Sequence, residues 1–476
     1  MTNKMQFTLK APTVMHVDIN SCFATVEQQA NPLIRGKPVV VAAYVEDHGC
    51  ILAASREAKQ LGIKTGMRVR EAKWLYSRLV VLAPDPDKYR YVNRQLLAVL
   101  EEYSAEVSIE SIDEMVLTLA DSPALERKVQ EVRTLMSNNT ENCSIVTLLD
   151  CWGNQNNPER KNSNIAIEQC NNLENHAIVT GAMVEIGKEI KQRIKTEIGD
   201  WMTVSIGIAP NRYLAKVASG LHKPDGLDII TRENIEKIFT GLRLEDLCGI
   251  KAGNANRLRY AGIMNPGIMY RTDAAALVRA FHSIVGYHWW NRLHGYEDGS
   301  LYKAFGAPQD EQKTFGQSYA FGKPYMPQDP KIHQVLTQLV IKMGRRVRHA
   351  GAVAHGIGVS ALFTDYSHWG ARETHALPLF ADNDFFHRTK TLLCAAPARP
   401  VRILAVYCFK LDRTLYAQES LLPEETKKKQ LTQAIDAIGD RWGEFVLTSG
   451  RMLHMDEQVL DRIAFGKVRD LTKTTV

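Results

Sequence analysis

The pattern of apolar and polar positions predicts strands that carry acidic residues at their ends. Residues 107–119 are rich in apolar and β-branched side chains on both sides of Asp113 and Glu114, which predicts two strands joined by a tight turn at these acids. Residues 14–20 form another short apolar run, and it carries a single acid, Asp18. Unpaired carboxylates are costly in apolar surroundings. The acids therefore mark either a solvated turn or a divalent-metal site.

Further apolar periodicity predicts alternating strands and helices along the rest of the chain. We expect strands within 35–43, 49–54, 202–208, 314–321, 354–363 and 401–411. We expect helices within 21–27, 55–66, 87–103, from 122, and within 181–198, 209–219, 330–350 and 385–394. Antiparallel strands backed by helices define an α+β architecture. Residues 137–174 are crowded with Asn and predict a surface insertion of loop or weak structure.

Composition narrows the class of protein. A chain of 476 residues is too long for one core, so several domains are expected. Its 45% hydrophobic and 24% charged residues are ordinary for a globular protein. We expect a cytoplasmic protein with no membrane segment, because no run approaches eighteen apolar residues and the start lacks a signal-peptide core. The eight cysteines contain no Cys-x-x-Cys pair and support neither a disulfide framework nor a zinc site.

Two basic segments suit a polyanionic partner, which the net charge of +6 permits. Residues 244–263 predict a helix, a Gly-x-x-x-Gly turn and a second helix, with Lys251 and Arg257 beside glycines that let backbone N–H groups approach a phosphate. The helix predicted over 330–350 carries Lys342, Arg345 and Arg346, which suit a phosphate backbone. An ordinary helical hairpin and a solvated basic face are the competing interpretations.

Several motifs in one order resemble the Y-family (translesion) DNA polymerases, of the DNA polymerase IV and polymerase V catalytic-subunit type. They lie at residues 17–27, 36–41, 111–114, 205–216, 223–226 and 249–262. The resemblance implies a multidomain right-hand polymerase with a C-terminal little-finger domain. Its parts would be a palm (12–22 and 84–223, with the insertion at about 137–174), fingers (23–83), a helix-hairpin-helix thumb (224–300), a linker (301–312), a little finger (313–411) and a tail (412–476).

The resemblance also implies the roles of individual residues. Asp18, Asp113 and Glu114 would be the catalytic acids and would hold two Mg²⁺ ions, Mn²⁺ being the alternative, with the Ile19 carbonyl as a further metal contact. Phe23 matches the aromatic residue that excludes a 2′-hydroxyl. Lys216 matches a palm lysine that contacts triphosphate. Arg56 and Lys59 align with triphosphate-binding positions that are Tyr and Arg in the polymerase IV branch, so both residue types depart from that pattern.

These correspondences imply a monomeric enzyme that adds dNTPs to the primer 3′-hydroxyl on a DNA template during damage tolerance. Residues Gln418, Leu421 and Leu422 resemble a sliding-clamp-binding peptide in the tail, which we expect to be largely disordered. The alternative is a catalytically weak family member that works as a DNA-binding, clamp-tethered accessory protein. A nucleotidyl cyclase with a similar palm is disfavoured, since a small-molecule enzyme has no need of the basic duplex-binding segments.

Overall fold

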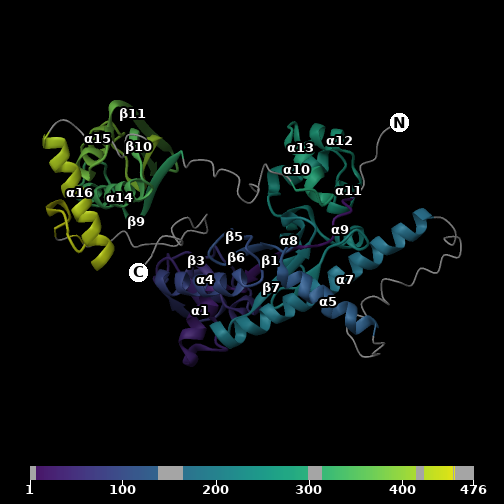
Figure 1. The fold of residues 1–476 in the computed structure, drawn as a ribbon. Helices are drawn as coiled ribbons and strands as arrows, with labels where there is room; N and C mark the ends of the chain where they lie inside the picture. The colour runs from purple at the N-terminus through teal and green to yellow at the C-terminus, as the bar shows by residue number, and fades with distance from the viewer. Residues whose placement is uncertain (1–6, 138–163, 298–312, 414–422, 454, 456–476) are drawn as a thin grey trace. The chain divides into compact units, whose positions relative to one another are not determined.

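The computed structural model describes residues 7–137, 164–297, 313–413, 423–453 and 455. They form two compact units, one within residues 1–307 and the other within residues 308–461 (Figure 1). The boundary falls inside the segment 301–312 that we predicted to be a linker. Within the described residues, no helix has the length and apolar character needed to cross a membrane.

A five-stranded sheet organises the first unit, with β1 at its centre. The strand order is β5-β6-β1-β7-β8; β7 and β8 are parallel and the other neighbours are antiparallel. The bounds are Val14–Ile19 for β1, Val107–Ile109 for β5, Glu114–Thr118 for β6, Val204–Ala209 for β7 and Leu227–Ile229 for β8. Strands β5 and β6 are joined at the acids, as the sequence predicts, and the register places Asp18 opposite Glu114.

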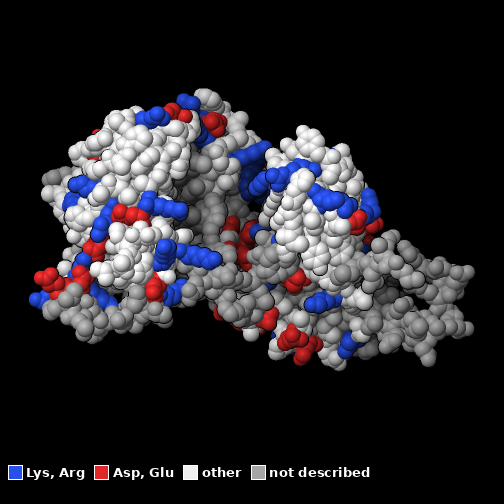
Figure 2. Space-filling model, turned by 90° about the horizontal axis from the view of Figure 1, so that it is seen from above, with Lys and Arg blue, Asp and Glu red and all other residues white. Residues whose placement is uncertain are grey.

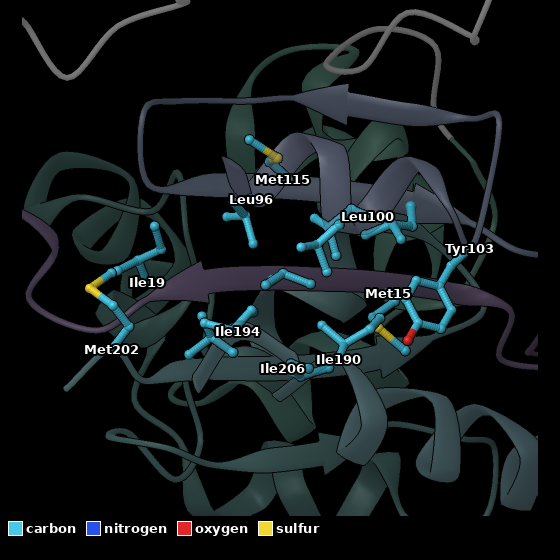
Figure 3. Close-up of a cluster of buried hydrophobic side chains, with 14 of the residues drawn as sticks. Met15, Ile19, Leu96, Leu100, Tyr103, Met115, Ile190, Ile194, Met202 and Ile206 are labelled. Carbon is cyan, nitrogen blue, oxygen red and sulfur yellow. The ribbon is translucent and has the colours of Figure 1, made fainter. Parts of the chain in front are cut away.

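Helices pack on both faces of this sheet. They are α1 (Cys22–Ala30), α4 (Pro86–Glu101), α5 (Pro123–Ser137), α7 (Asn164–Arg193) with the π-helical turn Ile194–Ile198, and α8 (Arg212–Ser219). Met15 and Ile19 of β1 join Leu96 of α4 and Ile190 of α7 in one apolar layer (Figure 3). Because successive strand side chains point to opposite faces, Asp18 lies on the other face.

The rest of the first unit is a small sheet and a group of short helices. The three-stranded sheet, in the order β3-β2-β4, carries α2 and α3. Its elements are β2 (Val39–Ala42), β3 (Ile51–Ala54), β4 (Val80–Leu82), α2 (Arg56–Gln60) and α3 (Val69–Leu75), after the 3-10 turn Pro32–Ile34. The group that we call the thumb helices comprises α9 (Ile235–Gly241), α10 (Ala252–Tyr260), α11 (Pro266–Arg271), α12 (Ala274–Phe281) and α13 (Val285–Leu293). Where the sequence predicts a helix at the start of 244–263, the structure has only a 3-10 turn, Leu244–Asp246. Gly249, with φ +94°, does not continue a helical backbone after this turn.

The second unit is a four-stranded antiparallel sheet, in the order β11-β10-β12-β9, packed against helices. Its elements are β9 (Thr314–Tyr325), α14 (Pro330–His349), β10 (Val353–Phe363), β11 (His368–Leu379), α15 (Asp382–Cys394), β12 (Val401–Asp412), α16 (Pro423–Trp442) and the 3-10 turn Gly450–Met452. The sequence pattern did not predict β11. This strand lies at the sheet edge, where its solvent-facing side chains are polar and supply little apolar signal.

Two predictions of disorder or loop are wrong. Residues 164–174 belong to α7 and not to a loop, because helix propensity is a weak guide once a segment continues a packed helix. Residues 423–442 of the tail form α16, which ion pairs anchor to α14. Residues 138–163 and the predicted clamp-binding residues Gln418, Leu421 and Leu422 lie outside the described residues.

Candidate active site

A pocket of about 520 Å³ opens where β1 ends and α1 begins. Three segments that are distant in sequence build it. Strand β1 contributes Asp18, the β5–β6 turn contributes Asp113, and α2 contributes Arg56 and Lys59. The lining residues that carry charge or a polar or aromatic group include Asp18, Asn20, Ser21, Cys22, Phe23, Arg56, Lys59, Gln60, Thr65, Asp113 and Lys223. Anionic and cationic side chains therefore share one cavity.

Asp18 and Asp113 form the acidic side of the pocket. The backbone ties them together, because the Ile19 N–H donates to the Asp113 carbonyl at 2.9 Å. Burial raises the pKa of Asp113, and the negative charges of Asp18 and Glu114 raise it further. Both carboxylates and Ile19, which the resemblance implies as metal ligands, line the pocket. A cation bound between the two carboxylates would offset their mutual repulsion.

Glu114 points to a different set of partners. Its carboxylate is bonded to the Lys216 ammonium and lies 3.6 Å from His16 Nε2. Burial alone would raise the pKa of Glu114, but His16 and Lys216 together lower it to about 2. Neither Glu114 nor Lys216 lines the pocket. Lys216, which the resemblance implies as a triphosphate contact, therefore pairs with the third predicted acid, Glu114.

Lys223 stands where the sequence pattern did not single out a site residue. Its Nζ lies 2.5 Å from Asp18 Oδ2, and it lines the pocket. Asn20 positions the turn at residues 223–226 that carries Lys223. Its Oδ1 accepts from the Asp225 N–H at 2.8 Å, and its Nδ2 donates to Ser205 Oγ at 2.8 Å. The available signal was a lysine in the Lys-Pro-Asp-Gly turn of a recognised motif, but its distance from Asp18 along the chain concealed the contact.

Arg56 and Lys59 of α2 line the same cavity as the acids. Ser55 caps α2 by accepting from the Ala58 N–H at 3.3 Å, which fixes the start of this helix. Lys59 Nζ donates to Ser21 Oγ at 2.8 Å. Burial and the neighbouring Lys223 lower the pKa of Lys59. Three cationic side chains around one pocket are suited to a polyphosphate.

Phe23 forms a wall of the same pocket and is only 1% exposed. It lies in the first turn of α1, and its ring stacks on Tyr89 of α4 with centroids 4.4 Å apart. The predicted position of this aromatic residue beside the nucleotide is therefore compatible with the cavity.

The donor atoms of the pocket suit Mg²⁺. Among the described residues, no group of three or more His, Cys, Asp or Glu side chains is arranged to hold a metal, which agrees with the position of Glu114 beside Lys216. The pocket itself offers the carboxylates of Asp18 and Asp113. Mg²⁺ is commonly bound by one or two carboxylates together with substrate phosphates. The residues present therefore fit a metal that arrives with a phosphate-bearing ligand.

The predicted DNA contacts of the first unit lie on α10. Lys251 and Arg257 are exposed, and Figure 2 shows Lys and Arg side chains in a row across the thumb helices. Arg259, in contrast, is paired with Glu245 at 2.6 Å. The glycine turn before α10 has the positive φ that glycine favours, at Gly249.

The predicted DNA contacts of the second unit are already engaged by protein. Lys342 is 5% exposed and lies 3.0 Å from Glu444. Arg345 lies 2.7 Å from Asp440, and Arg346 donates to the Gly316 carbonyl at 3.3 Å. Arg345 is thus paired with α16, Lys342 with Glu444 just beyond the end of α16, and Arg346 with β9. The tail, which we expected to be largely disordered, therefore supplies partners for two of the three predicted DNA contacts.

Comparison with known proteins agrees with this site and fold. The model of the impB/mucB/samB family matches residues 17–220, and that of the family's C-terminal domain matches residues 312–421. The chain is 25% identical to DNA polymerase IV 1 of Bacillus subtilis, covering 96% of this chain and 97% of that protein. It is 27% identical to DNA polymerase IV of Pelotomaculum thermopropionicum, and the match covers 90% of this chain and 93% of that protein.

A solved structure shows the same fold. A Y-family DNA polymerase chimera aligns with a TM-score of 0.61 at 21% identity and covers 84% of this chain and 98% of its own. Fold and site together define a polymerase of the right-hand class with a C-terminal little-finger domain. The chain belongs to the impB/mucB/samB family and is a Y-family DNA polymerase.

Proposed function

We propose that this chain is an error-prone translesion polymerase that adds dNTPs to a primer 3′-hydroxyl during DNA damage tolerance. The observation that carries the proposal is the pocket in which Asp18 and Asp113 face Arg56, Lys59 and Lys223. Such a cavity provides carboxylates for metal ions and cations for a triphosphate in one place. The names of the curated relatives, which are DNA polymerases IV, support the same reaction.

Asp18 and Asp113 would hold two Mg²⁺ ions, with the Ile19 carbonyl as a further ligand. Bound there, the ions would supply activation of the primer 3′-hydroxyl and stabilisation of the charge that develops on the phosphates. Burial, and then the charges of Asp18 and Glu114, raise the pKa of Asp113, and a bound cation would offset both effects by stabilising the carboxylate. Glu114 would hold the side chains of Lys216 and His16 in position. As the third metal ligand that the resemblance implies, its carboxylate would have to turn into the pocket.

The three cations of the pocket would bind the triphosphate. In the absence of substrate, Lys223 neutralises Asp18 and Lys59 is held by Ser21. Both ammonium groups lie at the cavity and can exchange these partners for phosphate oxygens. Lys223 would then contact the incoming nucleotide in addition to Lys216, the palm lysine that the resemblance implies. Arg56 would supply the guanidinium that Lys59 lacks at its own position.

Primer extension tests the proposal directly. The purified chain would be given undamaged and abasic templates, Mg²⁺ and all four dNTPs, beside the variant Asp113→Asn. We expect distributive extension on both templates by the wild-type chain and none by the variant, with DNA binding unchanged. Extension that survives the Asp113→Asn change would contradict the assignment of the carboxylates. Wild-type binding without extension, even with the sliding clamp added, would favour the accessory-protein alternative.

We also propose that the sliding clamp is a partner, through residues 418–422. This proposal rests on sequence alone, since Gln418, Leu421 and Leu422 resemble a clamp-binding peptide. We expect added clamp to lengthen the extension products of the wild-type chain but not those of a Leu421→Ala/Leu422→Ala double variant. Equal stimulation of both proteins would exclude this segment as the contact.

A further inference from the structure

A closed set of contacts holds the aromatic wall of the pocket in place. The Tyr89 hydroxyl donates to Glu27 Oε1 at 3.0 Å, and the Tyr89 ring stacks on Phe23 with an interplanar angle of 13°. Phe23 and Glu27 are one helical turn apart on α1, so they lie on the same face of that helix. The Tyr89 side chain of α4 therefore contacts two residues of α1, Glu27 and Phe23.

Glu27 is an unusual residue to find in this position. Its side chain is 8% exposed, although carboxylates are almost never buried without a partner. Its partners among the described residues are the Tyr89 hydroxyl and one cation, Lys88, whose Nζ lies 2.9 Å from Glu27 Oε2. Tyr89 itself is fully buried in the core. Burial and the charge of Glu27 raise the pKa of Tyr89, so its hydroxyl keeps the proton that it donates.

The stack has a mechanical consequence for the pocket. An aromatic ring in the first turn of a helix can change its side-chain angles unless neighbouring atoms hold it. One face of the Phe23 ring is held by Tyr89, and Phe23 also lines the cavity. Movement of Tyr89 away from Phe23 would leave space behind the ring, and the wall could recede from a bound nucleotide.

We propose that Glu27 is a positioning residue for sugar selection, which anchors Tyr89 and thereby holds Phe23 against the sugar of the incoming nucleotide. This inference rests on the proposed function, to which it adds an orientation: the nucleoside triphosphate lies in the pocket with its sugar beside Phe23. Glu27 itself does not line the pocket and acts only through the two rings. Loss of the anchor should therefore weaken discrimination between dNTP and rNTP more than it slows dNTP addition.

The experiment compares kcat/KM for one dNTP and the matching rNTP in the full-length chain. Glu27→Gln keeps the size of the side chain but removes its charge, and Tyr89→Phe keeps the ring but removes the hydroxyl. We expect each to lower the ratio of dNTP to rNTP efficiency by about 5- to 20-fold, while Phe23→Ala lowers it by about 100-fold. The main change should be a lower KM for the rNTP.

A double-variant cycle separates a positioning role from a structural one. In the Phe23→Ala background, Glu27→Gln should leave the ratio unchanged, because the wall that it positions is absent. Tyr103→Phe is the matched control, since its hydroxyl donates to Glu189 Oε1 at 2.9 Å near the far end of α4, and it should leave the ratio at the wild-type value. Binding of the same two nucleotides with Ca²⁺ in place of Mg²⁺ should show the same order of ratios without turnover.

The outcomes are distinguishable. If Phe23→Ala lowers the ratio but Glu27→Gln and Tyr89→Phe both slow dNTP and rNTP addition equally, the positioning role is wrong and Glu27 is merely structural. If Phe23→Ala leaves the ratio of efficiencies and the ratio of binding constants unchanged, the sugar does not lie at this wall. That result overturns the inference together with the nucleotide orientation in the proposed function.

Discussion

The ammonium of Lys223 lies 2.5 Å from the carboxylate of Asp18, which places a cation on one of the two acids that line the pocket. The two residues are far apart in sequence and meet because β1 lies beside the strand β7 that leads into α8 and its following turn. Lys223 therefore shares the pocket with Asp18 and is within reach of the triphosphate that the proposed function places there.

Lys223→Gln should therefore weaken nucleotide binding more than it slows the chemical step. We expect the KM for dNTP to rise by about 10-fold, which is the loss of one charge-assisted contact, with a smaller change in kcat. Steady-state primer extension measures both constants. Lys195→Gln is the control, because Lys195 pairs with Asp225 of the same turn at 3.4 Å but does not line the pocket. A KM that stays at the wild-type value in Lys223→Gln would exclude the triphosphate contact.

Glu114 should make the chain sensitive to acid. Its pKa is lowered from 4.5 to about 2 in the folded chain, so the unfolded chain binds more protons between these values. The stabilisation is present above pH 4.5 and is lost as the pH falls toward 2. It amounts to about 3 kcal/mol at most. In urea unfolding at several pH values, Glu114→Gln should be less stable at pH 6 and should lose less stability on acidification. Parallel pH profiles of the two proteins would disprove the linkage.

The contact between α16 and α14 should be a large contributor to the stability of the second unit. Arg348 is 4% exposed and donates to both oxygens of Asp436, at 2.5 and 2.9 Å, and to Asp382 at 2.8 Å. Asp436→Ala leaves a buried guanidinium with one carboxylate, which should cost about 3 kcal/mol.

Hydrogen exchange of the β9–β12 sheet measures this loss in the full-length chain. The control Asp365→Ala breaks the pair between Asp365 and Arg399, whose side chains are 52% and 55% exposed, and should leave the protection of the sheet nearly unchanged because water screens exposed ion pairs. Equal protection in the Asp436→Ala variant and the wild-type chain would show that α16 is not bound to α14 in solution.

The salt dependence of DNA binding should distinguish the two basic segments. Lys251 and Arg257 are exposed on the thumb helices, so Ala at either position should reduce the slope of log Kd against log salt by about 0.9 if each contacts one phosphate. Lys342 is paired with Glu444 and Arg345 with Asp440 of α16, and Ala at these positions should leave the slope unchanged. Fluorescence anisotropy with duplex DNA at several salt concentrations measures the slope. A reduced slope for Lys342→Ala would mean that α16 leaves α14 when DNA binds.

The amino-acid sequence by itself determined the local elements of the site and the family to which the chain belongs. The turn at Asp113 and the strand that carries Asp18 follow from short-range apolar patterns, and these patterns depend only on neighbouring residues. Arg56, Lys59 and Phe23, which the family's motifs single out as substrate-binding residues, line the same pocket as Asp18 and Asp113.

Only the tertiary structure decided which charged groups are paired. Lys223 meets Asp18, Lys216 meets Glu114, and α16 covers the basic face of α14, and each of these contacts joins segments that are distant in sequence. A pattern of residues records charge and hydrophobicity but not the partner of a charge. Because that partner decides whether a lysine is free to bind phosphate, the pattern could assign the pocket's residues but not the state of its charges or the role of the tail.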